Sequence, residues 1–176
     1  KNIALNFRFW INRVQTDIIL AKAVQFCKYL IRERGISITF LSTCQGIKEY
    51  TDDNESAQLI VGELDEVDRD KCTISALKYS PKALIAAYSK YDLYIGMRLH
   101  GAILSMLGGV PAMNIGYEDK TEGIYSTLGL DDYQVHSQKP LEDWVTTAQV
   151  FIDEASLIRK KLPGIISEAS TKSWQS

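Results

Sequence analysis

An arginine and a histidine stand two residues apart in the segment YIGMRLHGA, which covers residues 94–102. Arg98 carries a planar and permanently charged guanidinium group that suits carboxylates and phosphates. His100 can accept or donate a proton near neutral pH. Gly101 and Ala102 are small enough to let a ligand or a neighbouring strand approach closely. The segment therefore predicts an anion-binding site with a proton-transfer group beside it.

The flanking residues predict how this pair is positioned. Residues 92–96 form a short apolar run that is typical of a strand buried in a parallel sheet, and residues 99–107 predict a helix. In such sheets, ligands bind at the carboxyl ends of the strands. The helix start adds unpaired backbone N–H groups and partial positive charge, which favour an anion. Simpler interpretations stay open, because a lone histidine can be a helix cap and a lone arginine a salt-bridge partner.

Strands and helices alternate along the whole chain. Strands are predicted at residues 1–7, 36–41, 72–74, 92–96, 110–115 and 133–135. Helices are predicted at residues 16–34, 54–64, 81–89, 99–107, 121–128, 141–162 and 165–174. The last two are separated by an expected break at Pro163-Gly164. This alternation, without hairpin signals, predicts one α/β domain with a doubly wound parallel sheet and helices on both faces.

Three further groups lie at predicted strand ends. Arg8 ends the first strand and is expected on the same ligand-binding rim, although the aromatic residues around it could simply pack in the core. Residues 117–120 (YEDK) follow a later strand, and their charges could orient a substrate or hold a metal ion; a solvated loop is the simpler interpretation. Asp52 and Asp53 are most simply helix caps.

Composition excludes several classes of protein. The 176 residues fit a single domain, 45% of them are apolar, and the net charge of −2 argues against a nucleic-acid-binding protein that works through bulk positive charge. No apolar run reaches the 18–20 residues of a membrane span. Three widely spaced cysteines suit reduced thiols in the cytosol, and no zinc pattern is present. The sequence also lacks the glycine-rich motifs of nucleotide-binding loops and the GxSxG motif of the α/β-hydrolase nucleophile turn.

Two consecutive segments resemble the signature region of polysaccharide pyruvyl transferases. They are IGMRLHGAILSMLGGVP and AMNIGYEDKTEGIYSTLGL, which together cover residues 95–130. The family's Arg-Leu-His element matches residues 98–100, its Gly-Val-Pro element matches residues 109–111, and Arg8 resembles the arginine that follows its first strand. One departure stands out, because residues 118–120 are Glu-Asp-Lys where the family usually has Asp-Pro-Lys.

The resemblance implies a two-domain enzyme of the GT-B type, with its active site between two Rossmann-like halves. This chain, which starts directly in a strand, would be the carboxyl-terminal half, and its partners would be the amino-terminal half, phosphoenolpyruvate and a glycan acceptor. The implied reaction transfers a pyruvyl group to a sugar as a ketal. His100 would be catalytic, and the implied substrate-binding residues are Arg98, Arg8, Leu99, Lys120 and Glu118. No cofactor is implied with certainty, a divalent metal ion stays open, and the expected location is the cytoplasm or the inner membrane surface.

Two other functions stay open at this point. A glycosyltransferase of the GT-B type would place the diphosphate of a nucleotide-sugar donor in the same anion site. A non-catalytic binding module is favoured by the substituted residues 118–120. Binding of phosphoenolpyruvate, compared with UDP and GDP, separates these possibilities.

Overall fold

The computed structural model describes residues 1–9, 13–43 and 52–175, and it contains a six-stranded sheet in the order β3-β2-β1-β4-β5-β6. Every neighbouring pair of strands is parallel. The strands are β1 (Asn2–Asn6), β2 (Ser37–Phe40), β3 (Cys72–Ile74), β4 (Leu93–Gly96), β5 (Ala112–Gly116) and β6 (Gln134–His136). The chain leaves β1 toward β2 on one side, and later leaves β4 toward β5 on the other.

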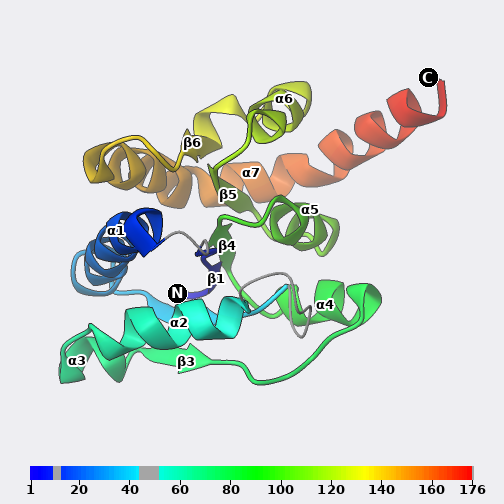
Figure 1. The fold of residues 1–176 in the computed structure, drawn as a ribbon. Helices are drawn as coiled ribbons and strands as arrows, with labels where there is room; N and C mark the ends of the chain where they lie inside the picture. Colours follow the sequence, from blue (N-terminus) through cyan, green and yellow to red (C-terminus); the bar gives the residue numbers. More distant parts are fainter. Residues whose placement is uncertain (10–12, 44–51, 176) are drawn as a thin grey trace.

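Helices cover both faces of this sheet (Figure 1). They are α1 (Arg13–Arg32), α2 (Asp53–Gly62), α3 (Glu66–Arg69), α4 (Pro81–Tyr88), α5 (Leu99–Leu107), α6 (Asp119–Thr127), the 3-10 helix η1 (Asp131–Tyr133) and α7 (Leu141–Gln175). In Figure 1, α1 and the first half of α7 lie on one side of the central strands, and α4 and α5 lie on the other. The predicted doubly wound, Rossmann-like α/β fold is therefore confirmed.

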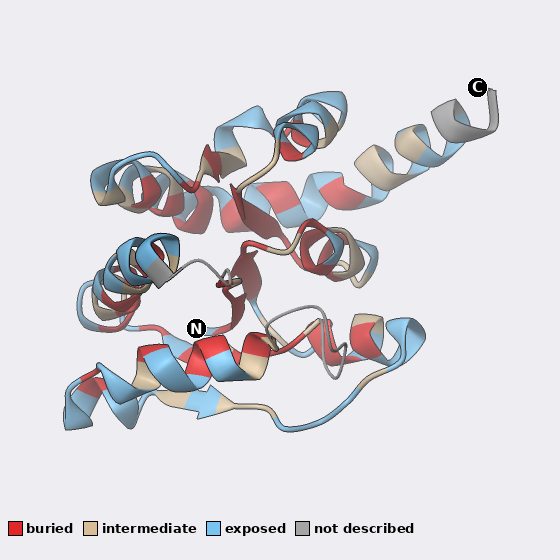
Figure 2. Cartoon of the chain, viewed as in Figure 1, coloured by how far each residue is buried: buried red, intermediate tan, exposed pale blue. Residues whose placement is uncertain are grey.

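The central strands are buried on both faces, as Figure 2 shows by their colour. All four residues of β4 and all five residues of β5 are buried, which matches the apolar sequence of β4 and, apart from the buried Asn114, that of β5. The core between β1, α1 and α7 is aromatic. The ring of Trp144 lies 6.2 Å from that of Phe7 and meets that of Phe26 edge-on at 5.9 Å. Through these contacts the beginning of α7, which the sequence predicts as a helix, docks on β1 and α1.

The predicted break at Pro163-Gly164 is wrong, because α7 runs without interruption through the proline. Proline removes the N–H that would bond to the carbonyl of Arg159 and normally kinks or ends a helix. Packing overrides this local effect. Leu162 is buried before the proline, and Ile165 and Ile166 pack against the core after it. None of the helices in the described part of the chain combines the length and hydropathy needed to cross a bilayer.

Two short elements, α3 and η1, lie where the sequence predicts no helix. The α3 helix is held by an ion-pair cluster, in which the buried carboxylate of Asp68 accepts hydrogen bonds from Arg32 of α1. Asp65 also pairs with Arg32. Arg32 lies 33 residues from Asp65 and 36 residues from Asp68 in the sequence. Such distant partners produce no local helix signal, so the sequence shows only a charged segment there.

Candidate active site at the β1–β4 switch point

The sheet reverses its winding between β1 and β4, and this is where ligands bind in open α/β folds. Arg8 lies two residues after β1, and Arg98 lies two residues after β4. A cavity of about 390 Å³ opens there. Its lining residues come from the ends of four strands: Arg8, Thr43, Met97, Arg98, Leu99, His100, Tyr117, Glu118, Lys120 and Thr121. The structure thus brings all six predicted site residues to one cavity.

Residues 98–100 form the turn from β4 into α5. Arg98 is the N-cap residue, with an extended backbone, and α5 begins at Leu99. The first N–H groups of α5 therefore lie at the cavity, as the sequence predicts. The three side chains differ in exposure, because Leu99 is buried in the core, the Arg98 side chain is 11% exposed, and His100 is exposed.

The guanidinium group of Arg98 pairs with Asp53, the first residue of α2. Oδ1 of Asp53 accepts hydrogen bonds from Nε and Nη2 of Arg98 at 2.9 and 2.7 Å. Sequence reasoning missed this pair. It treats Asp52 and Asp53 alike as helix caps, and only Asp52 has that role, accepting from the N–H of Asn54 at 2.9 Å. The contact could have been expected from the topology, because residues that follow parallel strands such as β2 and β4 meet at one edge of the sheet.

The backbone of Arg98 is held separately, through Asn6 and Tyr94. The backbone N–H of Arg98 donates to Oδ1 of Asn6 at 3.3 Å. The Tyr94 hydroxyl lies 2.9 Å from the same oxygen and 3.0 Å from the Arg98 carbonyl. A Cβ atom on Gly101 would lie 2.4 Å from this hydroxyl. The group that approaches Gly101 closely is therefore the Tyr94 side chain, and a glycine is needed there to make room for it. Burial raises the pKa of Tyr94 well above its usual value.

Arg8 and Lys120 place two further cations at the cavity. Nη1 of Arg8 donates to the Tyr117 hydroxyl at 2.7 Å, and the guanidinium carbon lies 4.9 Å from the centre of that ring. Lys120, which is exposed, forms an ion pair with the half-buried Glu118. The hydrogen bond to Glu118 raises the pKa of Lys120 above its usual value. The residues predicted as a loop after β5 include the start of α6, because Asp119 begins that helix.

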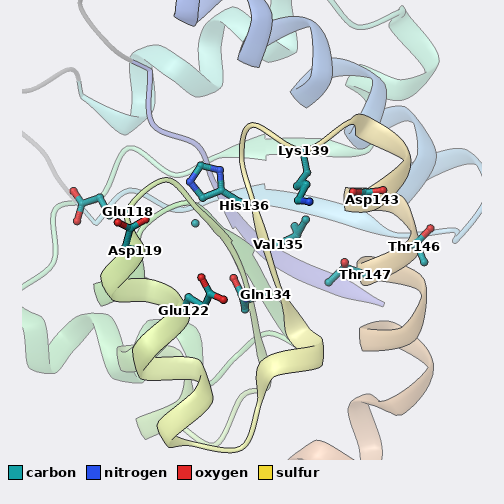
Figure 3. A pocket seen from close by; sticks show the side chains of 11 residues that line it. Glu118, Asp119, Glu122, Gln134, Val135, His136, Lys139, Asp143, Thr146 and Thr147 are labelled. Atoms are coloured by element: carbon teal, nitrogen blue, oxygen red, sulfur yellow. The ribbon is translucent and has the colours of Figure 1, made fainter.

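A second cavity of about 360 Å³ adjoins the first between α6, β6 and the start of α7 (Figure 3). Glu118 lines both cavities. In Figure 3, the carboxylates of Glu118, Asp119 and Glu122 come from the α6 side, whereas Lys139 and Asp143 come from the opposite wall. Among residues 1–9, 13–43 and 52–175, no group of three or more histidine, cysteine or acidic side chains is arranged to hold a metal ion.

The comparison with known families rests on the part of the chain that builds the first cavity. A family model described as polysaccharide pyruvyl transferase matches residues 2–119. The chain belongs to the polysaccharide pyruvyl transferase family. The match to this family includes Arg8 and residues 98–100, and it ends one residue before Lys120.

One curated relative is a protein of Erwinia amylovora named amylovoran biosynthesis protein AmsJ. It is 36% identical to this pyruvyl transferase family member over 100 residues. The aligned part covers 57% of this chain and 24% of AmsJ, so the chain matches about a quarter of the relative's length.

Proposed function

We propose that this chain is the carboxyl-terminal, Rossmann-like half of a two-domain pyruvyl transferase of the GT-B type. In this proposal the enzyme moves a pyruvyl group from phosphoenolpyruvate to two hydroxyls of a surface or secreted polysaccharide. The observation that carries it is the cavity at the β1–β4 switch point, where Arg8, Arg98 and the α5 N-terminus meet. Phosphoenolpyruvate carries both a carboxylate and a phosphate, and arginines at a helix start suit both groups.

The proposed reaction needs one proton delivered and two removed. The methylene carbon of phosphoenolpyruvate gains a proton, and the central carbon then forms two bonds to sugar oxygens. The bond from that carbon to the phosphate oxygen breaks. Of the two protons lost by the sugar hydroxyls, one balances the new methyl group and the other leaves on phosphate. The products are the cyclic ketal and inorganic phosphate.

The side chains around the cavity divide this work between them. Arg98 and Arg8 bind the donor's anionic groups, Lys120 and Glu118 contact the substrates, and His100 transfers protons as general acid or base. The exposure of His100 at the first turn of α5 supports its role, because the imidazole is accessible to a ligand in the cavity. Leu99 shapes the cavity wall between the two polar neighbours. Because the donor is a metabolic phosphate ester, we place the reaction in the cytoplasm or at the inner membrane surface.

The test measures phosphate release from phosphoenolpyruvate by the full-length protein with candidate glycans. We expect His100→Ala to lower kcat by 10²-fold or more, in the range typical of general acid–base groups. The matched control is His136→Asn, which keeps an acceptor for the Gln138 N–H and lies outside the first cavity. Full ketal formation by His100→Ala contradicts the catalytic assignment. If the protein binds UDP or GDP saturably but does not bind phosphoenolpyruvate, it is a nucleotide-sugar glycosyltransferase. If it binds none of these compounds, it is a non-catalytic module.

A further inference from the structure

Asp53 is a buried carboxylate whose two oxygens serve different partners. Its side chain is 1% exposed. Oδ1 accepts both hydrogen bonds from Arg98, and Oδ2 accepts the backbone N–H of Thr43 at 3.0 Å and its hydroxyl at 3.2 Å. Asp53 therefore joins the residues that follow β2 to those that follow β4, across the end of β1.

We propose that Asp53 is a positioning residue for anion binding, which fixes the guanidinium plane of Arg98 at the cavity. An arginine side chain has several rotatable bonds, and ordering it at the moment of binding costs affinity. The carboxylate holds the Nε and Nη2 edge of the group before any ligand arrives. It also supplies the counter-charge that a largely buried guanidinium requires.

The fold separates this role from support of the main chain. Asn6 and Tyr94 hold the backbone of Arg98, and Asp53 contacts the side chain. Asp52, not Asp53, provides the side-chain cap of α2. Removal of the Asp53 charge is therefore expected to weaken the hold on the Nε and Nη2 edge of the guanidinium while the turn from β4 into α5 keeps its shape.

Asp68 offers a matched control elsewhere in the molecule. Its side chain is equally buried, and it accepts hydrogen bonds from Nε and Nη2 of Arg32. This pair joins α1 to α3 and lines neither cavity at the strand ends. Asp68→Asn therefore reproduces the loss of a buried carboxylate charge beside an arginine without touching the proposed site.

The affinity test uses the full-length protein and rests on the proposed function. Asp53→Asn is expected to raise the Kd and KM for phosphoenolpyruvate at least tenfold, with a smaller change in kcat, whereas Asp68→Asn changes the Kd less than twofold. In an Arg98→Lys background, Asp53→Asn is expected to add less than twofold, because lysine lacks the guanidinium plane that Asp53 is proposed to fix. Equal effects of Asp53→Asn in both backgrounds, or an unchanged Kd, overturn the proposal.

A second measurement does not depend on the substrate or on the folding of Asp53→Asn. The Nε–H proton of Arg98, identified in the NMR spectrum by its absence in Arg98→Lys, is expected to exchange with water at least tenfold more slowly than those of exposed arginines. Exchange as fast as theirs overturns the proposal even if Asp53→Asn does not fold. Slow exchange that is lost in Asp53→Asn supports positioning even where phosphoenolpyruvate does not bind, and in that case only the proposed function fails.

Discussion

Gly101→Ala tests the packing on which the candidate site is built. The new Cβ would lie 2.4 Å from the Tyr94 hydroxyl oxygen, 2.9 Å from its Cζ and 3.1 Å from Cγ2 of Thr43. An ordinary contact is about 3.4 Å or more, so the hydroxyl must retreat by about 1 Å. That movement disturbs its buried contacts with Asn6 and Arg98. Overpacking costs about 1–3 kcal/mol and a disturbed buried hydrogen bond about 1–3 kcal/mol, against about 1 kcal/mol gained in helix propensity.

The net expectation is that Gly101→Ala lowers the free energy of unfolding by about 3 kcal/mol. For a chain of this size that corresponds to a fall in Tm of roughly 6–12 °C. Gly123→Ala is the matched control, because Gly123 also lies inside a helix and its Cβ would meet nothing within 4 Å. It is expected to gain about 0.5–1 kcal/mol. Thermal and urea unfolding followed by circular dichroism measure both. A Tm for Gly101→Ala at or above that of the wild type refutes the described packing of Tyr94 against α5.

Three further outcomes are expected elsewhere in the molecule. Pro163→Ala restores a hydrogen bond to the Arg159 carbonyl and should raise the free energy of unfolding by about 1–3 kcal/mol; no gain would indicate a helix that ends at the proline. Burial, with a smaller effect of Asp68, raises the pKa of Cys72 to about 11, so alkylation at pH 8 should be on the order of a hundredfold slower in the folded than in the unfolded chain. Because the folded chain holds the thiol proton more tightly, the contribution of Cys72 to the free energy of unfolding is fully present below about pH 8.5 and is lost as the pH rises through 11. Equal alkylation rates in the folded and unfolded chain would contradict the burial of Cys72. Asp68→Ala should cost about 1–3 kcal/mol through its lost bonds to Arg32, as read from urea unfolding.

The sequence predicts the architecture well because its elements carry local signals. The apolar run of β4 and the serine that caps α4 ahead of Pro81 both identify elements without reference to distant residues. The rule that strand ends share one edge then brings Arg8 and Arg98 together, although 90 residues separate them. The cavity at the switch point follows from this rule and from the parallel topology.

Other features depend on partners that no local pattern reveals. Asp53 has the sequence context of a helix cap, and its contact with Arg98 exists only because α2 starts beside the end of β4. At Pro163, local propensity is overridden by the buried Leu162 and by the isoleucines that pack against the core. In both places tertiary contacts decide a structure that local chemistry leaves open or opposes.

The turn from β4 into α5 places an arginine and a histidine at one cavity, with an apolar residue between them. Leu99 and His100 are the first two residues of α5, so their side chains point about 100° apart around the helix axis. Leu99 is buried in the core, which orients the first turn of α5 and leaves His100 on another side of the helix. Arg98 then lies within reach of Asp53, while His100 remains exposed at the cavity. The apolar residue between the two polar ones is therefore part of the proposed site, because the burial of Leu99 orients the helix start that carries His100.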